Sequence, residues 1–220
     1  MACIHLVIFD MDGVLVKIKS SWDYLHMHFN VRDKASRYLR LYQEGKIDFL
    51  EWMRLDTELW INASGGRLHR SELVKILDRV PLDDEVDRVV KELRRMGKRI
   101  ALVSSGIDLL ARRVARVIGA EAWVANMLSF DKHGYLKPGG VPIVGVDKSR
   151  SVRRIIHELG VEAERTAYVG DSMWDSTAMQ VVGYPILLGE GDEVVRRYAK
   201  YRIKRLGELL DLIEVLDRGC

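Results

Sequence analysis

The chain has 220 residues, of which 48% are hydrophobic and 30% are charged, and its formal net charge at pH 7 is +3. This composition is typical of a globular protein and excludes a disordered or fibrous one, and the length allows one domain with an insert or two small domains. Because no apolar run approaches the roughly 20 residues of a membrane span, and no secretory signal is recognisable, we expect a cytoplasmic protein without a membrane partner.

The first predicted element is a strand over 3–9, CIHLVIF, whose nearly continuous apolar run indicates burial on both faces. The two cysteines, Cys3 and Cys220, lie at opposite ends of the chain and are too few for a disulfide framework or a zinc site. We therefore expect Cys3 to be a small core residue. Two acids, Asp10 and Asp12, follow the strand directly.

Residues 20–80 differ from the rest of the chain in their hydrophobic pattern, since they contain amphipathic helical patterns and no convincing strand. The patterns are SSWDYLHMHF, DKASRYLRLYQEG, DFLEWMRLDTELW and HRSELVKILDRV. Eight of the 17 aromatic residues of the chain lie here, which is more typical of a helical-bundle core than of a ligand cage. We predict a helical cap domain over 17–80, inserted into a core domain made of 1–16 and 81–220.

After Pro81, predicted strands alternate with predicted helices of 10 to 15 residues. The strands are predicted at 99–103, 122–125, 166–170 and 184–189, with a β-hairpin over 127–137. Such alternation indicates a parallel sheet with right-handed crossovers. The predicted fold class is therefore α/β, a Rossmann-like parallel sheet with an inserted four-helix-type cap after the first strand.

Two compositional features bear on partners and habitat. The basic residues of 91–99 and 112–116 recur at helical spacing among Val and Leu, which is typical of solvated helix faces, so no nucleic-acid partner is expected. Asn and Gln are scarce while Arg and Glu are abundant, which favours a thermophilic source.

Polar side chains are predicted to converge at the carboxyl ends of the strands, where open parallel sheets bind ligands. They are Asp10 and Asp12, Ser104-Ser105-Gly106, Lys148, and Asp171 with Asp175. Each signal alone also fits a helix cap, a turn or a surface position. Together, hard carboxylate oxygens suit Mg²⁺, a hydroxyl with N–H groups at a helix N-terminus suits an anion, and the lysine suits phosphate oxygens. This set favours phosphoryl transfer.

The segments DMDGVL, VSSG, Lys148 and GDSMWD resemble, in order and spacing, the four motifs of the haloacid dehalogenase superfamily of phosphatases. The insert resembles the helical cap of the phosphoserine phosphatase-like branch. The resemblance implies that Asp10 is the nucleophile and forms an aspartyl-phosphate, and that Asp12 is the general acid and base. It implies Mg²⁺ held by Asp10, the backbone carbonyl of Asp12 and Asp171, with support from Asp175. Phosphate would be bound by Ser104, Ser105, Gly106 and Lys148.

The cap departs from the pattern of that branch, in which an acid binds the ammonium group of phosphoserine and an arginine binds its carboxylate. The matching positions are Lys19 and Asp56, with Arg54 close to the latter. Because both charges are reversed, phosphoserine is expected to be a poor substrate. Alternatively, Lys19 and Asp56 pair with each other across the cap interface.

Other functions remain open at this point. A receiver-like switch uses similar groups on an α/β sheet but would need neither the second acid nor the cap, and an inactive binding protein would not need every motif. A nucleotide-binding dehydrogenase lacks support, because no glycine-rich turn follows the first strand. The expected partner is a small phosphorylated substrate, and the protein is expected to be a monomer or a homodimer.

Overall fold

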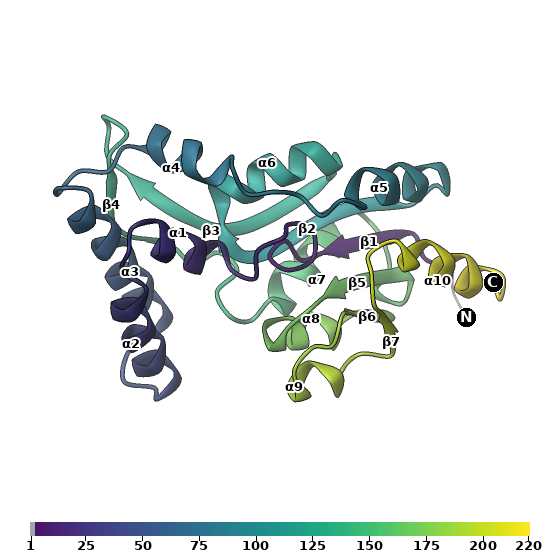
Figure 1. The fold of residues 1–220 in the computed structure, drawn as a ribbon. Coiled ribbons are helices and arrows are strands. Elements are labelled where there is room, and N and C mark those ends of the chain that lie inside the picture. The colour runs from purple at the N-terminus through teal and green to yellow at the C-terminus, as the bar shows by residue number, and fades with distance from the viewer. Residues whose placement is uncertain (1–2) are drawn as a thin grey trace.

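The computed structural model describes residues 3–220 and contains a seven-stranded sheet covered by helices (Figure 1). The strands are β1 (Leu6–Phe9), β2 (Arg99–Ile107), β3 (Ala122–Phe130), β4 (Leu136–Val141), β5 (Thr166–Gly170), β6 (Tyr184–Leu188) and β7 (Tyr201–Ile203). The helices are α1 (Ser21–His28), α2 (Arg32–Gln43), α3 (Phe49–Ala63), α4 (Arg70–Leu77), α5 (Val86–Arg95), α6 (Asp108–Ile118), α7 (Ser149–Glu158), α8 (Ser176–Met179), α9 (Glu193–Arg196) and α10 (Glu208–Asp217). Two 3₁₀ turns, η1 (Ala163–Arg165) and η2 (Met173–Asp175), flank β5.

The sheet order is β4-β3-β2-β1-β5-β6-β7, and every neighbouring pair is parallel except β3 with β4. The first strand lies in the middle, with Ile8 opposite Ala101 of β2 on one side and Tyr168 of β5 on the other. The chain reverses its direction of winding between β1 and β5, which is where doubly wound sheets bind ligands. The predicted α/β fold class is confirmed.

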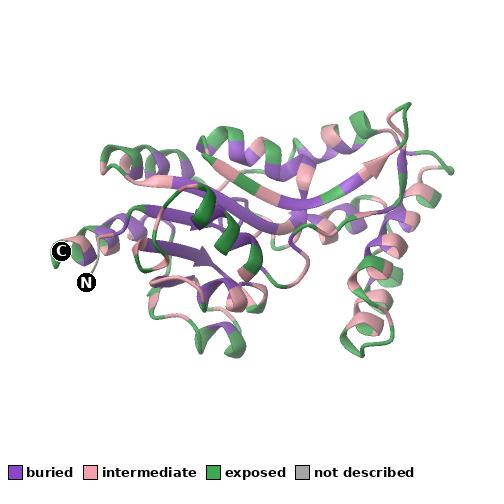
Figure 2. Ribbon diagram, turned by 180° about the vertical axis from the view of Figure 1, so that it is seen from behind, coloured by how far each residue is buried: buried purple, intermediate pink, exposed green. Residues whose placement is uncertain are grey.

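Helices cover both faces of the sheet, so the central strands β1, β2 and β5 are the most deeply buried part of the sheet (Figure 2). Residues of α5, α6 and α10, such as Leu93, Leu110 and Ile213, belong to one buried cluster. Residues of α7 and α8, such as Ile155 and Met179, belong to a second cluster on the other face. This three-layer arrangement explains the continuous apolar runs of the central strands.

The helices α1 to α4 lie between β1 and β2 in the chain, as the amphipathic patterns predicted. Ser20 and Asp48 cap α1 and α3, each accepting a hydrogen bond from a backbone N–H of the first turn. The apolar side chains Leu25, Trp60 and Leu73 belong to the same buried cluster as Phe9 of β1. The inserted helices therefore share an apolar core with one face of the sheet, and the division at residues 16 and 80 stays a prediction.

Several strands differ from the expected bounds, and β1 begins at Leu6 and not at residue 3. The second strand continues to Ile107, and the segments expected as a strand at 122–125 and as the first arm of the hairpin form the single strand β3. Strand β7 pairs with β6 at the far edge and had no counterpart in the sequence prediction. The hairpin of β3 and β4 packs against α3, where the Gly139 N–H donates to Thr57 Oγ1 at 2.7 Å.

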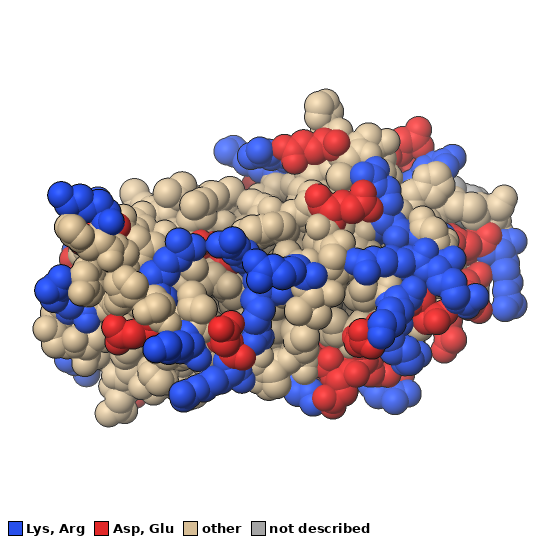
Figure 3. Space-filling view, turned by 90° about the horizontal axis from the view of Figure 1, so that it is seen from above, with Lys and Arg blue, Asp and Glu red and all other residues tan. Residues whose placement is uncertain are grey.

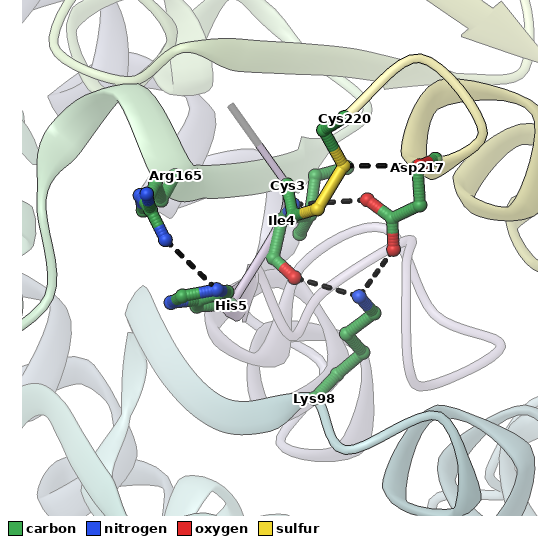
Figure 4. The surroundings of a disulfide bond; sticks show 7 residues. All are labelled: Cys3, Ile4, His5, Lys98, Arg165, Asp217 and Cys220. Carbon is green, nitrogen blue, oxygen red and sulfur yellow. Dashed lines mark hydrogen bonds and ion pairs between the residues drawn. A yellow bond between two sulfur atoms is a disulfide. The ribbon is translucent and has the colours of Figure 1, made fainter. Parts of the chain in front are cut away.

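The prediction for the cysteines was wrong, because Cys3 and Cys220 form a disulfide with their Cα atoms 5.4 Å apart (Figure 4). The contacts around it bring the two ends of the chain together: Asp217 Oδ1 accepts a hydrogen bond from the Ile4 N–H at 3.0 Å, and Asp217 Oδ2 pairs with Lys98. The disulfide therefore fastens the end of α10 beside the start of β1.

Charged side chains of both signs lie over the face that carries α4, α5 and α6, with acids between many of the basic residues (Figure 3). Several are paired along one helix, for example Arg95 with Glu92 and Lys91 with Asp87. Within residues 3–220, none of the helices combines the length and the apolar character that crossing a membrane requires.

Candidate active site

A pocket of about 430 Å³ opens where the carboxyl ends of β1 and β2 meet the inserted helices. Residues of the sheet side that line it include Asp10, Asp12, Ser104, Ser105, Gly106 and Lys148. Residues of the helical insert that line it include Trp22, His26, Arg32, Phe49, Trp52 and Asp56. The structure thus brings most of the predicted sheet-edge residues and part of the insert to one cavity, while Asp171 and Asp175 are not part of its lining.

Lys148 is the centre of the charged group at the sheet edge. Although its side chain is only 1% exposed, its Nζ lies 2.8 Å from Asp10 Oδ1 and 2.7 Å from Asp175 Oδ1. Burial opposes the charge on this lysine, but the two carboxylates outweigh that effect and raise the pKa of Lys148 above its ordinary value. Burial also raises the pKa of Asp10 well above its usual range, while Lys148 lowers it. Lys148 therefore remains an ammonium and stabilises the buried carboxylates.

Asp175 is fully buried and both of its oxygens are used within the protein. Oδ1 accepts from Lys148 and from the Tyr168 hydroxyl at 2.7 Å. Oδ2 accepts from the backbone N–H groups of Asp171 and Ser172 at 2.9 and 3.1 Å. With this set of donors, Asp175 fixes the position of Lys148 and the turn after β5.

Oxygens of Asp10, Asp171 and Asp175 lie within 4.8 Å of one another, which makes this a candidate site for a cation. The donor set of hard carboxylate oxygens fits Mg²⁺. Asp171 follows β5, and burial raises the pKa of its carboxyl, while Lys19 lowers it. The backbone at Gly13 passes so close to Asp171 that there is no room for a side chain, because a Cβ atom there would lie 2.2 Å from Asp171 Oδ2. The side chain of Asp12 is not part of this cluster.

The carboxylate of Asp12 is directed by α1. Asp12 Oδ2 accepts hydrogen bonds from both the backbone N–H and the hydroxyl of Ser21 at 2.8 Å, whereas Oδ1 is buried without a partner. Burial raises the pKa of Asp12 to about 6, although the bonds from Ser21 lower it. Gly106 leaves room for this arrangement, because a Cβ there would lie 2.7 Å from Asp12 Oδ2. Asp12 can therefore hold or release a proton near neutral pH.

The segment Ser104–Gly106 lies in the pocket wall, but it is extended strand and not a helix N-terminus, because α6 begins at Asp108. Ser104 Oγ accepts from the Gly106 N–H at 2.9 Å, while Ser105 Oγ is buried and has no partner. The backbone carbonyl of Ser105 accepts from Asn126 at 2.8 Å. The prediction that these N–H groups lie at a helix N-terminus was therefore wrong. The hydroxyl of Ser105 has no hydrogen-bond partner within the protein, so it could donate to a ligand.

The cap residues do not pair as the alternative proposed. Lys19 Nζ lies 2.6 Å from Asp171 Oδ2, and Asp56 Oδ2 lies 3.3 Å from His26 Nε2. Arg54 forms ion pairs with Glu51 and Glu58, and it lines a separate shallow groove beside β4. Arg54 is therefore outside the pocket, whereas Asp56 lies within it.

Sequence reasoning missed four residues that arrange this site: Ser21, His26, Asn126 and Tyr168. Ser21 lies at the start of α1, and His26 lies within the segment whose aromatics were attributed to a bundle core. Asn126 joins the end of β2 to the loop after β4, because its amide donates to Ser105 O while its oxygen accepts from the N–H groups of Val144 and Gly145 at 3.0 Å. A polar residue inside an apolar strand was the available signal for Asn126 and Tyr168.

Comparisons with known proteins agree with this geometry. The sequence profile of the haloacid dehalogenase-like hydrolases matches residues 4–183. A phosphoserine phosphatase of Archaeoglobus fulgidus is 27% identical over 96% of this chain, which spans 60% of that protein's length. A phosphoglycolate phosphatase of Methanothrix thermoacetophila is 35% identical over 72% of this chain and 71% of its own length.

The fold is also that of solved phosphatase structures. A phosphoserine phosphatase structure, described as a phospho-aspartyl intermediate analogue, superposes with a TM-score of 0.80 over 96% of this chain and 99% of its own, at 23% identity. The resemblance drawn from the four motifs is therefore confirmed. The chain is an enzyme that belongs to the haloacid dehalogenase-like hydrolase family, and its relatives are phosphatases.

Proposed function

We propose that this enzyme is a Mg²⁺-dependent phosphomonoester hydrolase that works through an aspartyl-phosphate on Asp10. The observation that carries the proposal is the placement of Lys148 between Asp10 and Asp175, 2.8 and 2.7 Å from their oxygens, at the wall of the pocket. A buried nucleophile beside a fixed cation suits phosphoryl transfer, which depends on positioning and on neutralising charge. The superposed phosphoserine phosphatase, which was solved as a phospho-aspartyl intermediate analogue, agrees with this chemistry.

The metal would be held by Asp10, by the backbone carbonyl of Asp12 and by Asp171, while Asp175 supports the site through Lys148. When bound, Mg²⁺ supplies positive charge to the phosphate oxygens and offsets the repulsion between the acids. A protein of related fold, the 3-deoxy-D-manno-octulosonate 8-phosphate phosphatase of Moraxella catarrhalis, was solved in complex with magnesium and phosphate ions. The cluster of Asp10 with Asp171 in this chain supports the same assignment.

Asp10 would attack the phosphorus atom while Lys148 and the Ser104–Gly106 segment bind the phosphate oxygens. The carboxylate of Asp10 is buried, so little water competes with substrate around it. The unpartnered hydroxyl of Ser105 would donate to a phosphate oxygen.

Asp12 would donate a proton to the leaving oxygen and then remove one from the water that hydrolyses the aspartyl-phosphate. Two features support this role: the hydrogen bonds from Ser21, which orient the carboxyl, and the pKa of about 6, which lets it act in both directions near neutral pH. Met11 between the two acids is buried away from the pocket, which leaves Asp10 and Asp12 on the same side.

The substrate would be a small phosphorylated metabolite. We infer that phosphoserine is a poor substrate, since the acid Asp56 lines the pocket from α3 while Arg54 is paired with two glutamates outside it. The names of the relatives differ on this point, since one is a phosphoserine phosphatase and another a phosphoglycolate phosphatase. A cytoplasmic location and a monomeric or homodimeric state remain predictions.

The test is phosphate release from a panel of phosphomonoesters, with Mg²⁺ and with EDTA, by wild type and by Asp10→Asn. The panel contains phosphoserine, phosphoglycolate, sugar phosphates, nucleotides and an aryl phosphate. Mg²⁺-dependent release that disappears in D10N supports the proposal. If the protein is folded and binds Mg²⁺ but releases phosphate from none of these esters, a switch or a binding role is favoured instead.

A further inference from the structure

Asp56 occupies the cap end of the pocket as a buried acid with an unused oxygen. Its side chain is 2% exposed, and Oδ1 is buried without a hydrogen-bond partner. Burial raises the pKa of Asp56, while the neighbouring His26 lowers it. Trp52 Nε1 is a second buried polar atom here without a hydrogen-bond partner. A buried polar atom without a partner is costly, so a ligand that supplies one gains affinity.

A hydrogen-bond chain fixes the orientation of Asp56. The indole N–H of Trp60 donates to His26 Nδ1 at 3.0 Å, and because an indole can only donate, this nitrogen carries no proton. The proton of the ring is therefore on Nε2, which lies 3.3 Å from Asp56 Oδ2. The ring of His26 thereby fixes the orientation of the Asp56 carboxylate.

The lysines and the arginine that line the pocket are engaged elsewhere. Lys148 lies between Asp10 and Asp175, and Lys19 pairs with Asp171. Arg32, which also lines the pocket, donates to Asp23 at 2.8 Å. Among the described residues that line this pocket, no lysine or arginine forms an ion pair with Asp56.

Aromatic rings form the wall beside Asp56. Trp22, Phe49 and Trp52 line the pocket, and Trp52 is held by stacking on Tyr42 at 4.8 Å between ring centroids and by an edge contact with Phe49 at 5.6 Å. Ring faces attract cations, and a carboxylate beside them adds to that attraction. A carboxylate in the same place would meet a like charge instead.

We propose that the cap end of this pocket binds a positively charged amine at Asp56, so that the preferred substrates are phosphate monoesters of amino alcohols that carry no carboxylate. The inference rests on the proposed phosphatase function and adds the chemical class of the leaving group. Phosphoserine satisfies it only in part, because its ammonium group suits Asp56 while its carboxylate has no cation to meet.

The test compares esters of similar size whose leaving groups differ in charge: phosphoethanolamine, phosphocholine, 2-hydroxyethyl phosphate, phosphoglycolate and phosphoserine. For wild type, kcat/KM for phosphoethanolamine should exceed that for the hydroxyethyl ester by about 10-fold to 100-fold, the range expected for a charged hydrogen bond. Phosphocholine, whose quaternary ammonium has no N–H to donate, should be preferred by a smaller factor, through its charge and its contact with the ring faces. Asp56→Asn should remove most of this preference. Glu58→Gln is the matched control, because Glu58 lies two positions further along α3 and pairs with Arg54 outside the pocket.

A preference that survives in D56N, or ammonium esters that react no faster than the hydroxyethyl ester, would overturn the inference while leaving the phosphatase function intact. If D56N does not fold, Trp52→Leu, which removes a ring face, should lower the preference for phosphocholine in its place. If no ester, including an aryl phosphate, releases phosphate, the proposed function fails. In that case, the affinities of wild type and D56N for phosphocholine are measured by tryptophan fluorescence. Equal affinities would refute the proposed role of Asp56.

Discussion

Lys19 Nζ lies 2.6 Å from Asp171 Oδ2, although the lysine side chain is 81% exposed and the aspartate side chain is 6% exposed. An ammonium group therefore reaches in from the surface to the carboxylate cluster that would hold Mg²⁺. This contact takes the place of the pairing of Lys19 with Asp56 that was the alternative interpretation of these charges, and it implies that the lysine and a metal ion compete for one oxygen.

Lys19→Met should consequently strengthen Mg²⁺ binding, by about 3-fold to 10-fold, since a competing cation at short range is removed. Isothermal titration of the metal-free protein with Mg²⁺ measures this directly and does not depend on turnover. Lys17→Met is the control, because Lys17 pairs with the exposed Asp84. Unchanged or weaker binding in K19M would show that Lys19 does not compete with the metal.

Ser21→Ala should impair the general acid more than the nucleophile. The variant loses the hydroxyl that donates to Asp12 and that accepts from the Ile107 N–H at 3.1 Å. We expect kcat for alkyl phosphates to fall by about 10-fold to 100-fold, and kcat for an aryl phosphate to fall less, because its leaving group needs less protonation. Ser20→Ala, which removes the N-cap of the same helix, should lower stability without this difference between substrates. Equal losses with both substrate types would argue against the role of Ser21.

Asp56 should make the stability of the protein depend on pH. Because burial raises the pKa of Asp56 in the folded state, the folded protein binds more protons than the unfolded chain between the two pKa values. The contribution of this group to stability is therefore full at pH values below the unfolded pKa and is lost as pH rises through the folded pKa.

D56N, which cannot ionise, should thus become more stable relative to wild type as pH rises from about 4 to about 7. Urea unfolding of both proteins in EDTA gives the two free energies of unfolding, and their difference cancels the effects of Asp10, Asp12 and Asp171. A difference that stays constant over this range would contradict the assignment.

The disulfide should contribute measurably to stability, because it closes a loop of 217 residues. Reduction or Cys220→Ser should lower the free energy of unfolding by about 2 to 5 kcal/mol. Thermal unfolding with and without reductant checks this, and C220S should not respond to reductant. Two reactive thiols in unreduced, denatured protein would contradict the disulfide itself.

The order of elements and the sheet edge were predictable because each depends on local pattern. The apolar strands set the sheet, and Asp10, Asp171 and Lys148 follow or precede elements whose topology brings them together. Charge partners in the cap were not predictable in the same way, because they depend on which helix face turns inward. Arg54 and Asp56 lie close together on α3, yet one lines a groove beside β4 and the other lines the pocket.

The disulfide was missed for a related reason. Cys3 and Cys220 are separated by nearly the whole chain, and only the packing of α10 against α5 brings the last residues back to β1. Nothing in the spacing of two cysteines carries that information, since connectivity depends on three-dimensional proximity.

The most direct test of the proposed mechanism is to look for phosphate on Asp10 itself. Wild type is quenched in acid during turnover of its best phosphomonoester, and the peptide that contains Asp10 and Asp12 is sequenced by mass spectrometry, with D10N treated in parallel. We expect a phosphorylated Asp10 in wild type, no phosphopeptide in D10N, and a loss of turnover in D10N of at least about 1,000-fold. Mg²⁺-dependent turnover that persists in D10N, with no phosphate found on Asp10 in wild type, would contradict the mechanism.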